Sequence, residues 1–292
     1  MKLEVLDWGG KGKTLILLAG LGADAHVYDD FAPKLTSGFR VLAITRRGYG
    51  ASSAPKPTCD NYSANRLGDD VLAVIDALHV DRPVLIGSSV AGEELSSIGT
   101  RYPNKVSGLV YLDAGYGYAY YDAKGAYGDA VVDFAVARRE IEQLVTPLAT
   151  RERKALGKDL QENTLPRVEK DLRLSQQHLE SIPDAPAPSE TPEVRFGFAV
   201  QRGIQKFGAV RCPALAIFAV PHNLGPQSGM SKPERAAAAA DELARTSAQV
   251  NAFESGNPTA RVVRLANADH HVFRSNESDV VREMKAFILK LP

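Results

Sequence analysis

The fold of this chain is decided by one segment, Pro83-Val84-Leu85-Ile86-Gly87-Ser88-Ser89-Val90-Ala91-Gly92-Glu93-Glu94-Leu95. It opens with aliphatic residues, passes through a cluster of very small residues and continues with residues that are compatible with a helix. This order predicts a strand that turns sharply and enters a helix. A serine at the tip of such a turn has strained backbone and an exposed hydroxyl, an arrangement known as a nucleophile elbow.

Two neighbouring serines compete for the tip of this turn. The residues two before and two after the tip pack against each other, so both should be small. Ser88 at the tip would bring two β-branched residues together, whereas Ser89 brings Gly87 and Ala91 together. Gly92 follows and lets the helix lie close to the strand. Ser89 is therefore the predicted tip, with alanine standing where the G-x-S-x-G pattern has its last glycine.

The composition limits the class of protein. With 292 residues, the chain is long enough for one large α/β domain with an insertion or for two modest domains. Its 44% hydrophobic and 24% charged residues are ordinary for a soluble globular protein. Its 35 lysines and arginines balance 35 acidic residues, so the net charge implies no attraction to nucleic acid or to an anionic membrane. A neutral small-molecule partner fits this balance best.

The sequence also bears on compartment and cofactors. No apolar run approaches the length of a membrane span, and residues 1–4 lack the apolar core of a signal peptide. We expect a cytoplasmic protein or the mature form of an exported one. Cys59 and Cys212 lie far apart and indicate neither a disulfide framework nor a metal site. No cofactor and no metal are predicted.

Segments typical of strands and helices alternate along most of the chain. Besides the strand that enters the elbow, we predict strands at 14–18, 39–45, 106–112, 213–220 and 260–266. We predict helices at 26–35, 63–78, 231–253 and 279–289. Such alternation favours a mostly parallel, doubly wound α/β sheet with helices on both faces.

The middle of the chain differs in kind. Residues 116–210 contain no convincing strand, and they have helical stretches around 130–145 and 165–182 before a proline-rich break. We therefore predict a core domain made of residues 1–115 and 211–292, with residues 116–210 as a helical cap inserted over the sheet.

A serine hydroxyl needs a neighbouring base to become a useful nucleophile. His270 and His271 follow the last predicted strand, at the same end of the parallel sheet as Ser89. Either imidazole can reach the serine from there. His79 and His178 fall on predicted helices away from this end and are expected to be surface residues.

The oxyanion that forms when the serine attacks a carbonyl group needs two fixed backbone donors. The amide of Val90, directly after the nucleophile, is one candidate. The second is expected in the glycine-rich turn Ala19-Gly20-Leu21-Gly22, which follows the first predicted strand. We predict that the amides of Leu21 and Val90 form the oxyanion hole.

Taken in order, these motifs resemble those of the α/β-hydrolase family, and the resemblance extends from Thr14 to Leu289. The early glycine-rich turn, the turn Arg47-Gly48-Tyr49-Gly50-Ala51-Ser52, the elbow and the late histidine segment follow the family's order. The resemblance implies an α/β-hydrolase fold with a helical cap inserted after strand six. It also implies a triad of serine, histidine and carboxylate, with Ser89 as nucleophile and His270 as base, and with His271 as an alternative base.

The carboxylate of the triad departs from the usual pattern. Most members carry it after the strand predicted here at 213–220, but that loop reads Pro221-His222-Asn223-Leu224-Gly225. Some members, such as the haloalkane dehalogenases, carry it directly after strand six, which is the position of Asp113. We predict that Asp113, rather than any residue after Val220, orients the histidine, and the alternative is an acid elsewhere in the chain. Asn223 can accept a hydrogen bond from the imidazole, but a neutral amide cannot stabilise the imidazolium. Ala19 also replaces the family's usual histidine, which should affect packing more than the oxyanion donors.

The leading functional hypothesis is a serine hydrolase that cleaves a neutral carboxylic ester through an acyl-enzyme. Tyr116 and Tyr120, which leave the strand before the cap, and His222 are expected to line the substrate site. Dehalogenases and epoxide hydrolases of this fold use an aspartate at the elbow, so Ser89 argues against both. Two alternatives stay open: a ligand-binding member that has lost turnover, and a lactonase, perhydrolase or carbon–carbon bond hydrolase with the same triad.

Overall fold

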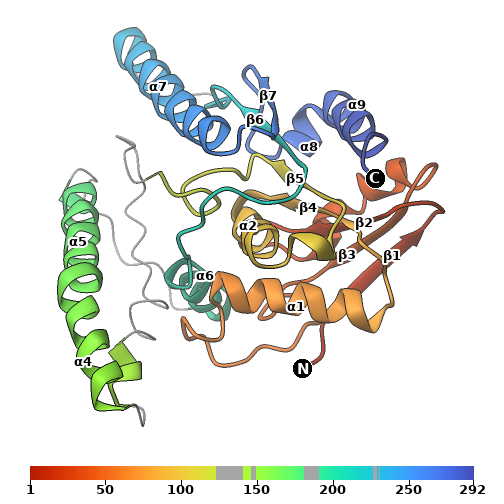
Figure 1. The fold of residues 1–292 in the computed structure, drawn as a ribbon. Coiled ribbons are helices and arrows are strands. Elements are labelled where there is room, and N and C mark those ends of the chain that lie inside the picture. Colours follow the sequence, from red (N-terminus) through yellow and green to blue (C-terminus); the bar gives the residue numbers. More distant parts are fainter. Residues whose placement is uncertain (123–140, 146–148, 181–190, 226–228, 230) are drawn as a thin grey trace.

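The computed structural model describes the chain except for residues 123–140, 146–148, 181–190, 226–228 and 230. Within the described residues, one sheet of seven strands has the order β1-β3-β2-β4-β5-β6-β7 (Figure 1). The strands are β1 (Val5–Gly9), β2 (Thr14–Leu18), β3 (Arg40–Ile44), β4 (Val84–Ser88), β5 (Gly108–Leu112), β6 (Ala214–Ala219) and β7 (Arg261–Leu265). Only the pairing of β1 with β3 is antiparallel, so the predicted mostly parallel, doubly wound sheet is confirmed.

Helices cover both faces of this sheet. The helices of the described residues are α1 (Ala64–Ala77), α2 (Gly92–Arg101), α4 (Thr150–Asp159), α5 (Leu165–Glu180), α6 (Pro192–Arg202), α7 (Lys232–Gly256), α8 (Val272–Ser275) and α9 (Glu277–Ile288), of which α4 and α5 lie away from the sheet (Figure 1). Helices α1, α2 and α7 pack on one face, and α8 and α9 pack on the other. The central strands β4, β5 and β6 are consequently buried along their whole length. Among the described helices, none is long and apolar enough to cross a membrane.

Two elements differ from the prediction. The edge strand β1 was not expected, because it is only partly buried, contains the charged Asp7 and ends at Gly9. The continuous helix predicted at 26–35 is wrong, since the chain forms two separate 3-10 turns, Ala25–Tyr28 and Ala32–Leu35. Pro33 lies in the first turn of the second segment, and it has no backbone N–H with which to continue a helix from the first.

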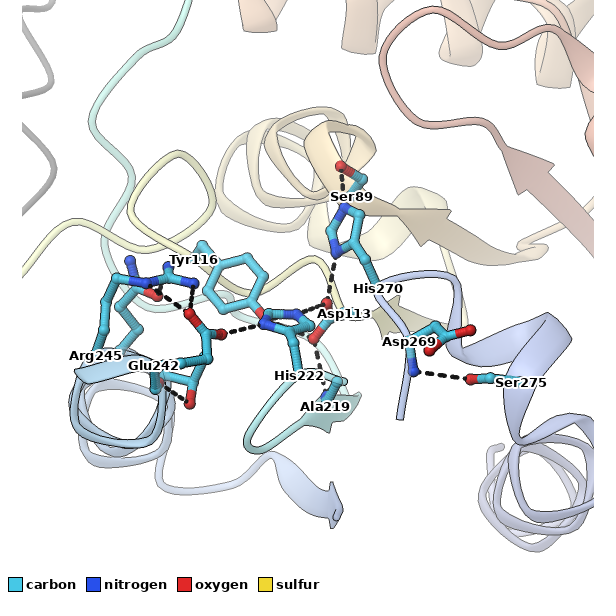
Figure 2. A network of polar contacts seen from close by, with 12 residues as sticks. Ser89, Asp113, Tyr116, Ala219, His222, Glu242, Arg245, Asp269, His270 and Ser275 are labelled. Carbon is cyan, nitrogen blue, oxygen red and sulfur yellow. Dashed lines mark hydrogen bonds and ion pairs between the residues drawn. The ribbon is translucent and has the colours of Figure 1, made fainter. Parts of the chain in front are cut away.

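Two predicted helix starts are confirmed by their caps. The Ser63 hydroxyl accepts a hydrogen bond from the Arg66 amide at the start of α1, at 3.4 Å. Ser231 and Glu234 form a reciprocal capping box at the start of α7. The long helix that follows runs beside the sheet to Gly256, and part of its length faces the carboxyl ends of the strands (Figures 1 and 2).

The elbow forms where β4 passes into α2 through one 3-10 turn, Ser89–Ala91. Gly87 lies close to this turn, since a Cβ atom there would be 3.1 Å from the Ala91 carbonyl oxygen. At Gly92 a Cβ atom would be 1.9 Å from the carbonyl oxygen of Ala114, which rules out any side chain. The start of α2 therefore packs directly on the segment that leaves β5, and this contact places the elbow beside the end of β5.

The chain between β5 and β6 contains α4, α5 and α6, and its described residues include no strand. A predicted helix around 130–145 falls mostly outside the described residues. Helix α6 packs beside the elbow, with Val200 in one apolar cluster with Tyr62 and Val90. The ring of Phe196 lies 5.7 Å from the ring of Tyr62. The division of the chain into a core and a cap at 116–210 remains our proposal.

A buried ion pair ties the elbow helix to the glycine-rich turn after β2. The Arg46 guanidinium contacts both carboxylate oxygens of Glu94, at 2.7 and 2.9 Å. It also donates to the carbonyl oxygens of Ala19 and Gly20, at 2.9 and 3.2 Å. Burial opposes the charge of Arg46, but Glu94 raises the pKa of this guanidinium above its usual range. The pair therefore fixes the turn that should carry one oxyanion donor.

Glu93, the residue before Glu94 in α2, has no such partner. Glu93 is completely buried, and neither of its carboxylate oxygens has a hydrogen-bond partner. Burial, together with the neighbouring charge of Glu94, raises the pKa of Glu93 well above its ordinary value. The folded protein therefore binds a proton at Glu93 more tightly than the unfolded chain does.

We expect Glu93→Gln to stabilise the protein above the pH at which a free glutamate ionises, which is about 4.3. The folded-state pKa of Glu93 is raised, so the wild type loses stability as the pH rises, whereas glutamine does not ionise. Urea unfolding should show a gain on the order of 1–2 kcal/mol at about pH 8 and a smaller gain near pH 4.

Glu94→Gln is the matched control on the adjacent residue. It removes the carboxylate that compensates the buried Arg46, and it should destabilise the protein by about 3 kcal/mol or more. Effects of the same sign in the two variants at about pH 8 would contradict this account.

Candidate active site

Ser89 occupies the strained position of the elbow. Its φ angle is +54°, in the left-handed region that a serine rarely adopts, whereas Ser88 has an extended conformation and a buried side chain. The loop after β2 lies against it, because a Cβ atom on Gly20 would be 3.1 Å from the Cβ atom of Ser89. Of the two serines, Ser89 is therefore the one at the tip of the turn.

One histidine reaches this serine from the loop after β7. His270 Nε2 lies 2.8 Å from Ser89 Oγ, and His270 Nδ1 lies 2.6 Å from Asp113 Oδ2 (Figure 2). His271 caps the short helix α8, and its ring lies 5.7 Å from the ring of Phe273. The geometry therefore links His270, and not His271, to the serine and the carboxylate.

The carboxylate of Asp113 is completely buried and receives several donors. Asp113 follows β5 directly and has a φ angle of +50°, a conformation that aspartate tolerates better than most residues. Its Oδ1 accepts from the Tyr116 hydroxyl at 2.5 Å and from the Ala219 amide at 2.9 Å. Burial alone would raise the pKa of Asp113, but hydrogen bonds from His222, His270 and Tyr116 lower it below its ordinary value. Asp113 is therefore ionised.

A second histidine binds the same carboxylate oxygen. His222 Nε2 lies 2.6 Å from Asp113 Oδ2, and its Nδ1 lies 2.5 Å from Glu242 Oε1 on α7 (Figure 2). Glu242 Oε2 in turn accepts from the guanidinium of Arg245 at 2.7 Å. The polar network thus continues from Ser89 through Asp113 to the side of α7.

Pairing between two loops positions both histidines. The backbone amide of Asn223 donates to the Ala268 carbonyl oxygen at 2.8 Å, and His222 forms an isolated parallel β-bridge with Ala268. The loops after β6 and β7 therefore run side by side for a few residues beyond the sheet. The Asn223 side chain contacts Asp269 at 3.0 Å, so the described contacts give it no link to His270.

A pocket of about 460 Å³ opens beside Ser89. Its described lining consists of Ser89, Tyr116, Tyr118, His222, Asn223, Arg245, Gln249 and His270. Tyr116 and His222 thus lie where the sequence predicted substrate contacts. Tyr120 does not, because its ring packs 6.3 Å from that of Phe253 and fills the space beside Gly256. The structure corrects its expected position from the pocket to the end of α7.

The two expected oxyanion donors come from the elbow turn and from the turn after β2. Val90 is the residue after Ser89 in the elbow turn. Leu21 follows Gly20, which packs against Ser89, and its side chain is partly exposed. The amides of Leu21 and Val90 remain the predicted oxyanion hole.

Three side chains of this site are close enough together to hold a metal ion. Ligand atoms of Asp113, His222 and His270 all lie within 4.8 Å of one another. The two nitrogen-to-oxygen distances of 2.6 Å are those of charge-assisted hydrogen bonds to one oxygen atom. Because Asp113 Oδ2 already accepts from both rings, the arrangement is that of a hydrogen-bonded network.

The sequence did not identify three pocket or network residues. These are Glu242, Arg245 and Gln249. Glu242 and Arg245 are three residues apart on an alanine-rich helix, which is the usual spacing of an exposed ion pair. Nothing in that spacing indicates that one end of the pair reaches a histidine from another loop.

Comparison with known protein families agrees with this geometry. A sequence profile of the alpha/beta hydrolase fold matches residues 13–197, which is more than half of the chain. The chain belongs to the α/β-hydrolase family. Asp113 directly follows β5, the last described strand before the segment that contains α4, α5 and α6.

Similar proteins in this family are hydrolases of several kinds. The fluoroacetate dehalogenase of a Burkholderia species is 32% identical over 107 residues, which cover 36% of this chain and 35% of that protein. The 2-(acetamidomethylene)succinate hydrolase of Mesorhizobium japonicum is 26% identical over 104 residues, which cover 36% of each. The chain thus spans little more than a third of the length of these two curated relatives.

Solved structures extend the likeness to the whole fold. The enol-lactonase from Burkholderia xenovorans LB400 has a TM-score of 0.59 and 19% sequence identity. The superposition covers 99% of this chain and 96% of that one. The likeness supports the α/β-hydrolase fold over both ends of the chain, including the region after residue 197 that the family profile does not reach.

We expect Asp113→Asn to remain folded while turnover falls by about 10⁴-fold, because an amide at this position favours the wrong tautomer of His270. Asn223→Ala, on the neighbouring loop, should retain most of its activity. Turnover of a nitrophenyl ester and circular dichroism of both variants check this. An active Asp113→Asn beside an inactive Asn223→Ala would move the acid to the loop after β6.

Proposed function

We propose that this protein is a serine hydrolase that cleaves neutral carboxylic esters through an acyl-enzyme intermediate. One observation carries the proposal, namely the continuous hydrogen-bonded chain from Ser89 Oγ through His270 to Asp113, with lengths of 2.8 and 2.6 Å. Nucleophile, base and orienting acid come from three different loops, and they meet in the order that acyl transfer requires.

The acylation step follows from this chain of contacts. His270 donates its Nδ1–H to Asp113, so its Nε2 is free to take the proton of the Ser89 hydroxyl. Ser89 Oγ then attacks the ester carbonyl carbon, and the negative charge collects on the carbonyl oxygen. The amides of Leu21 and Val90 would stabilise that oxyanion. His270 passes the proton to the departing alcohol as the ester bond breaks.

Deacylation reverses the same proton transfers with water as the nucleophile. His270 Nε2 takes a proton from a water molecule, and the resulting hydroxide attacks the acyl carbon. The proton returns to Ser89 Oγ as the acid product leaves. Asp113 remains ionised throughout and stabilises the imidazolium form of His270 in both steps.

The pocket and the elbow narrow the substrate class. A volume of about 460 Å³ suits a small organic molecule. The described lining mixes aromatic rings with polar groups and contains no carboxylate of its own. A serine at the elbow favours acyl transfer over the displacement chemistry of the dehalogenase relative. A lactone or another acyl compound remains an alternative substrate for the same triad.

A ligand-binding protein without turnover is the competing interpretation from another class. That interpretation was suggested by Asn223, a neutral residue at the position where most members of the family carry the acid. The contacts of Asp113 with His270 support an enzyme instead, because they supply a charged acid from a different strand.

We expect a fluorophosphonate probe to label Ser89 and no other serine. Ser89→Ala should abolish labelling and lower esterase turnover by several orders of magnitude. Ser88→Ala is the matched control, because its buried hydroxyl lies one residue earlier in β4, and it should still react with the probe. Labelling of Ser88, or of neither serine in the folded protein, would refute the assignment.

Two neighbouring tyrosines allow a test of the pocket. Tyr118 lines the pocket and Tyr120 packs against Phe253, so Tyr118→Ala should change the preference among acyl chain lengths and Tyr120→Phe should not. The measurement is kcat/KM on nitrophenyl esters of increasing acyl length. Equal selectivity profiles for wild type and Tyr118→Ala would remove Tyr118 from the substrate site.

A further inference from the structure

His222 is placed between two carboxylates. Its Nε2 faces Asp113 Oδ2 at 2.6 Å and its Nδ1 faces Glu242 Oε1 at 2.5 Å. An ionised carboxylate only accepts hydrogen bonds, so each ring nitrogen must carry a proton to make both contacts. A neutral imidazole has one N–H and would direct a lone pair at one of the two carboxylates.

A neutral His222 could also make both contacts if Asp113 or Glu242 carried a proton. The groups around each carboxylate disfavour that protonated form. Asp113 already accepts from the Tyr116 hydroxyl, the Ala219 amide and His270. Glu242 accepts from the Arg245 guanidinium. For each carboxyl group, burial opposes ionisation, but these donors and His222 lower the pKa below its ordinary value.

We infer that His222 is a positioning residue that acts as a fixed imidazolium, holding Asp113 in place and keeping a positive charge beside His270. This inference rests on the proposed function, in which His270 is the base. It adds a residue whose described hydrogen bonds do not reach Ser89 and whose effect on His270 passes through Asp113.

The charged and titratable side chains that face His222 come from each loop and helix around it. Asp113 and Tyr116 follow β5, Glu242 and Arg245 lie on α7, and His270 follows β7. Burial would lower the pKa of His222, but Asp113 and Glu242 raise it above the ordinary histidine value. The order of charges is negative at Asp113, positive at His222, negative at Glu242 and positive at Arg245. These four charges sum to zero before His270 gains a proton.

This balance has a consequence for the base. In a triad with a lone aspartate, the proton gained by histidine neutralises an uncompensated negative charge. Here Asp113 is already compensated by His222, whose ring centre lies 5.7 Å from that of His270. A second positive charge at that distance disfavours the imidazolium form of His270. His270 therefore takes the proton of Ser89 in the presence of a fixed positive charge that a lone aspartate would not bring.

The protonation state of His222 can be measured without turnover. In ¹⁵N-labelled protein, the two ring nitrogens have similar chemical shifts in an imidazolium and very different ones in a neutral imidazole. His222→Gln assigns the signal by its loss, among six histidines in the chain. We expect His222 to be doubly protonated at about pH 7. A His222 with one bare nitrogen at that pH would overturn the inference.

The pH dependence of kcat/KM tests the effect on the base. His222→Gln keeps a donor toward Asp113 without the charge, and Glu242→Gln keeps an acceptor for His222 without its carboxylate. Both variants should move the acid limb of the profile to higher pH, by about one pH unit or more. A purely structural role would lower kcat/KM at every pH and leave the acid limb where it is.

His79→Gln is the control, since His79 is exposed just after α1 and lies outside the network of Asp113, His222 and Glu242. Its acid limb should coincide with that of the wild type. The ¹⁵N measurement and the pH profile also distinguish a failure of this inference from a failure of the proposed function. An inactive wild type would refute the esterase proposal, whereas an active enzyme with a neutral His222 or an unmoved acid limb would refute the role of His222 alone.

Discussion

The buried carboxylate of Asp113 is the point on which the rest of the site depends. It lies at the end of β5 with no exposed surface, so its charge is stable only where donors surround it. Those donors come from the start of the inserted segment, from the end of β6 and from the loops after β6 and β7. The hydrogen bonds that this one carboxylate needs thus fix the relative positions of segments that are more than a hundred residues apart in the sequence.

Two close approaches of the backbone complete that arrangement. Gly92 lets α2 pack on the Ala114 carbonyl oxygen, which holds the elbow next to Asp113. On the other side of the serine, Arg46 binds the carbonyl oxygens of the turn that contains Gly20. The amide of Leu21 in the same turn is the proposed second oxyanion donor. A strained residue such as Ser89 persists only where its surroundings are fixed in this way.

Most of the fold could be predicted from the sequence because its signals are local. The small residues around Ser89, the cap at Ser63 and the box at Ser231 each specify one element without knowledge of the rest. The edge strand β1 and the two 3-10 turns before β3 were harder. Their form depends on pairing with β3 and on one proline, and not on an apolar period.

The site was predicted only as far as chain position determines it. Asp113 and His270 each follow a parallel strand, so their place at one edge of the sheet was accessible from the sequence. The contact between His222 and Glu242 was not, because it depends on the direction of α7 and on which turn of that helix faces the loop after β6. Tyr120 was misplaced for a related reason, since the side chains of an irregular segment have no fixed period to follow.

The positions of His222 and Glu242 also explain how Asp113, rather than a residue on the loop after β6, can serve as the acid. An aspartate after β6 would approach the histidine from the position that His222 now fills, and two carboxylates sharing that space would repel each other. With Asp113 as the acid, the loop after β6 can carry a cation instead, and Glu242 compensates that cation from α7. Removal of either member of the pair leaves a buried or half-buried charge without its partner. The position of Asp113 and the presence of His222 are therefore linked, because His222 donates to the same carboxylate oxygen that accepts from His270.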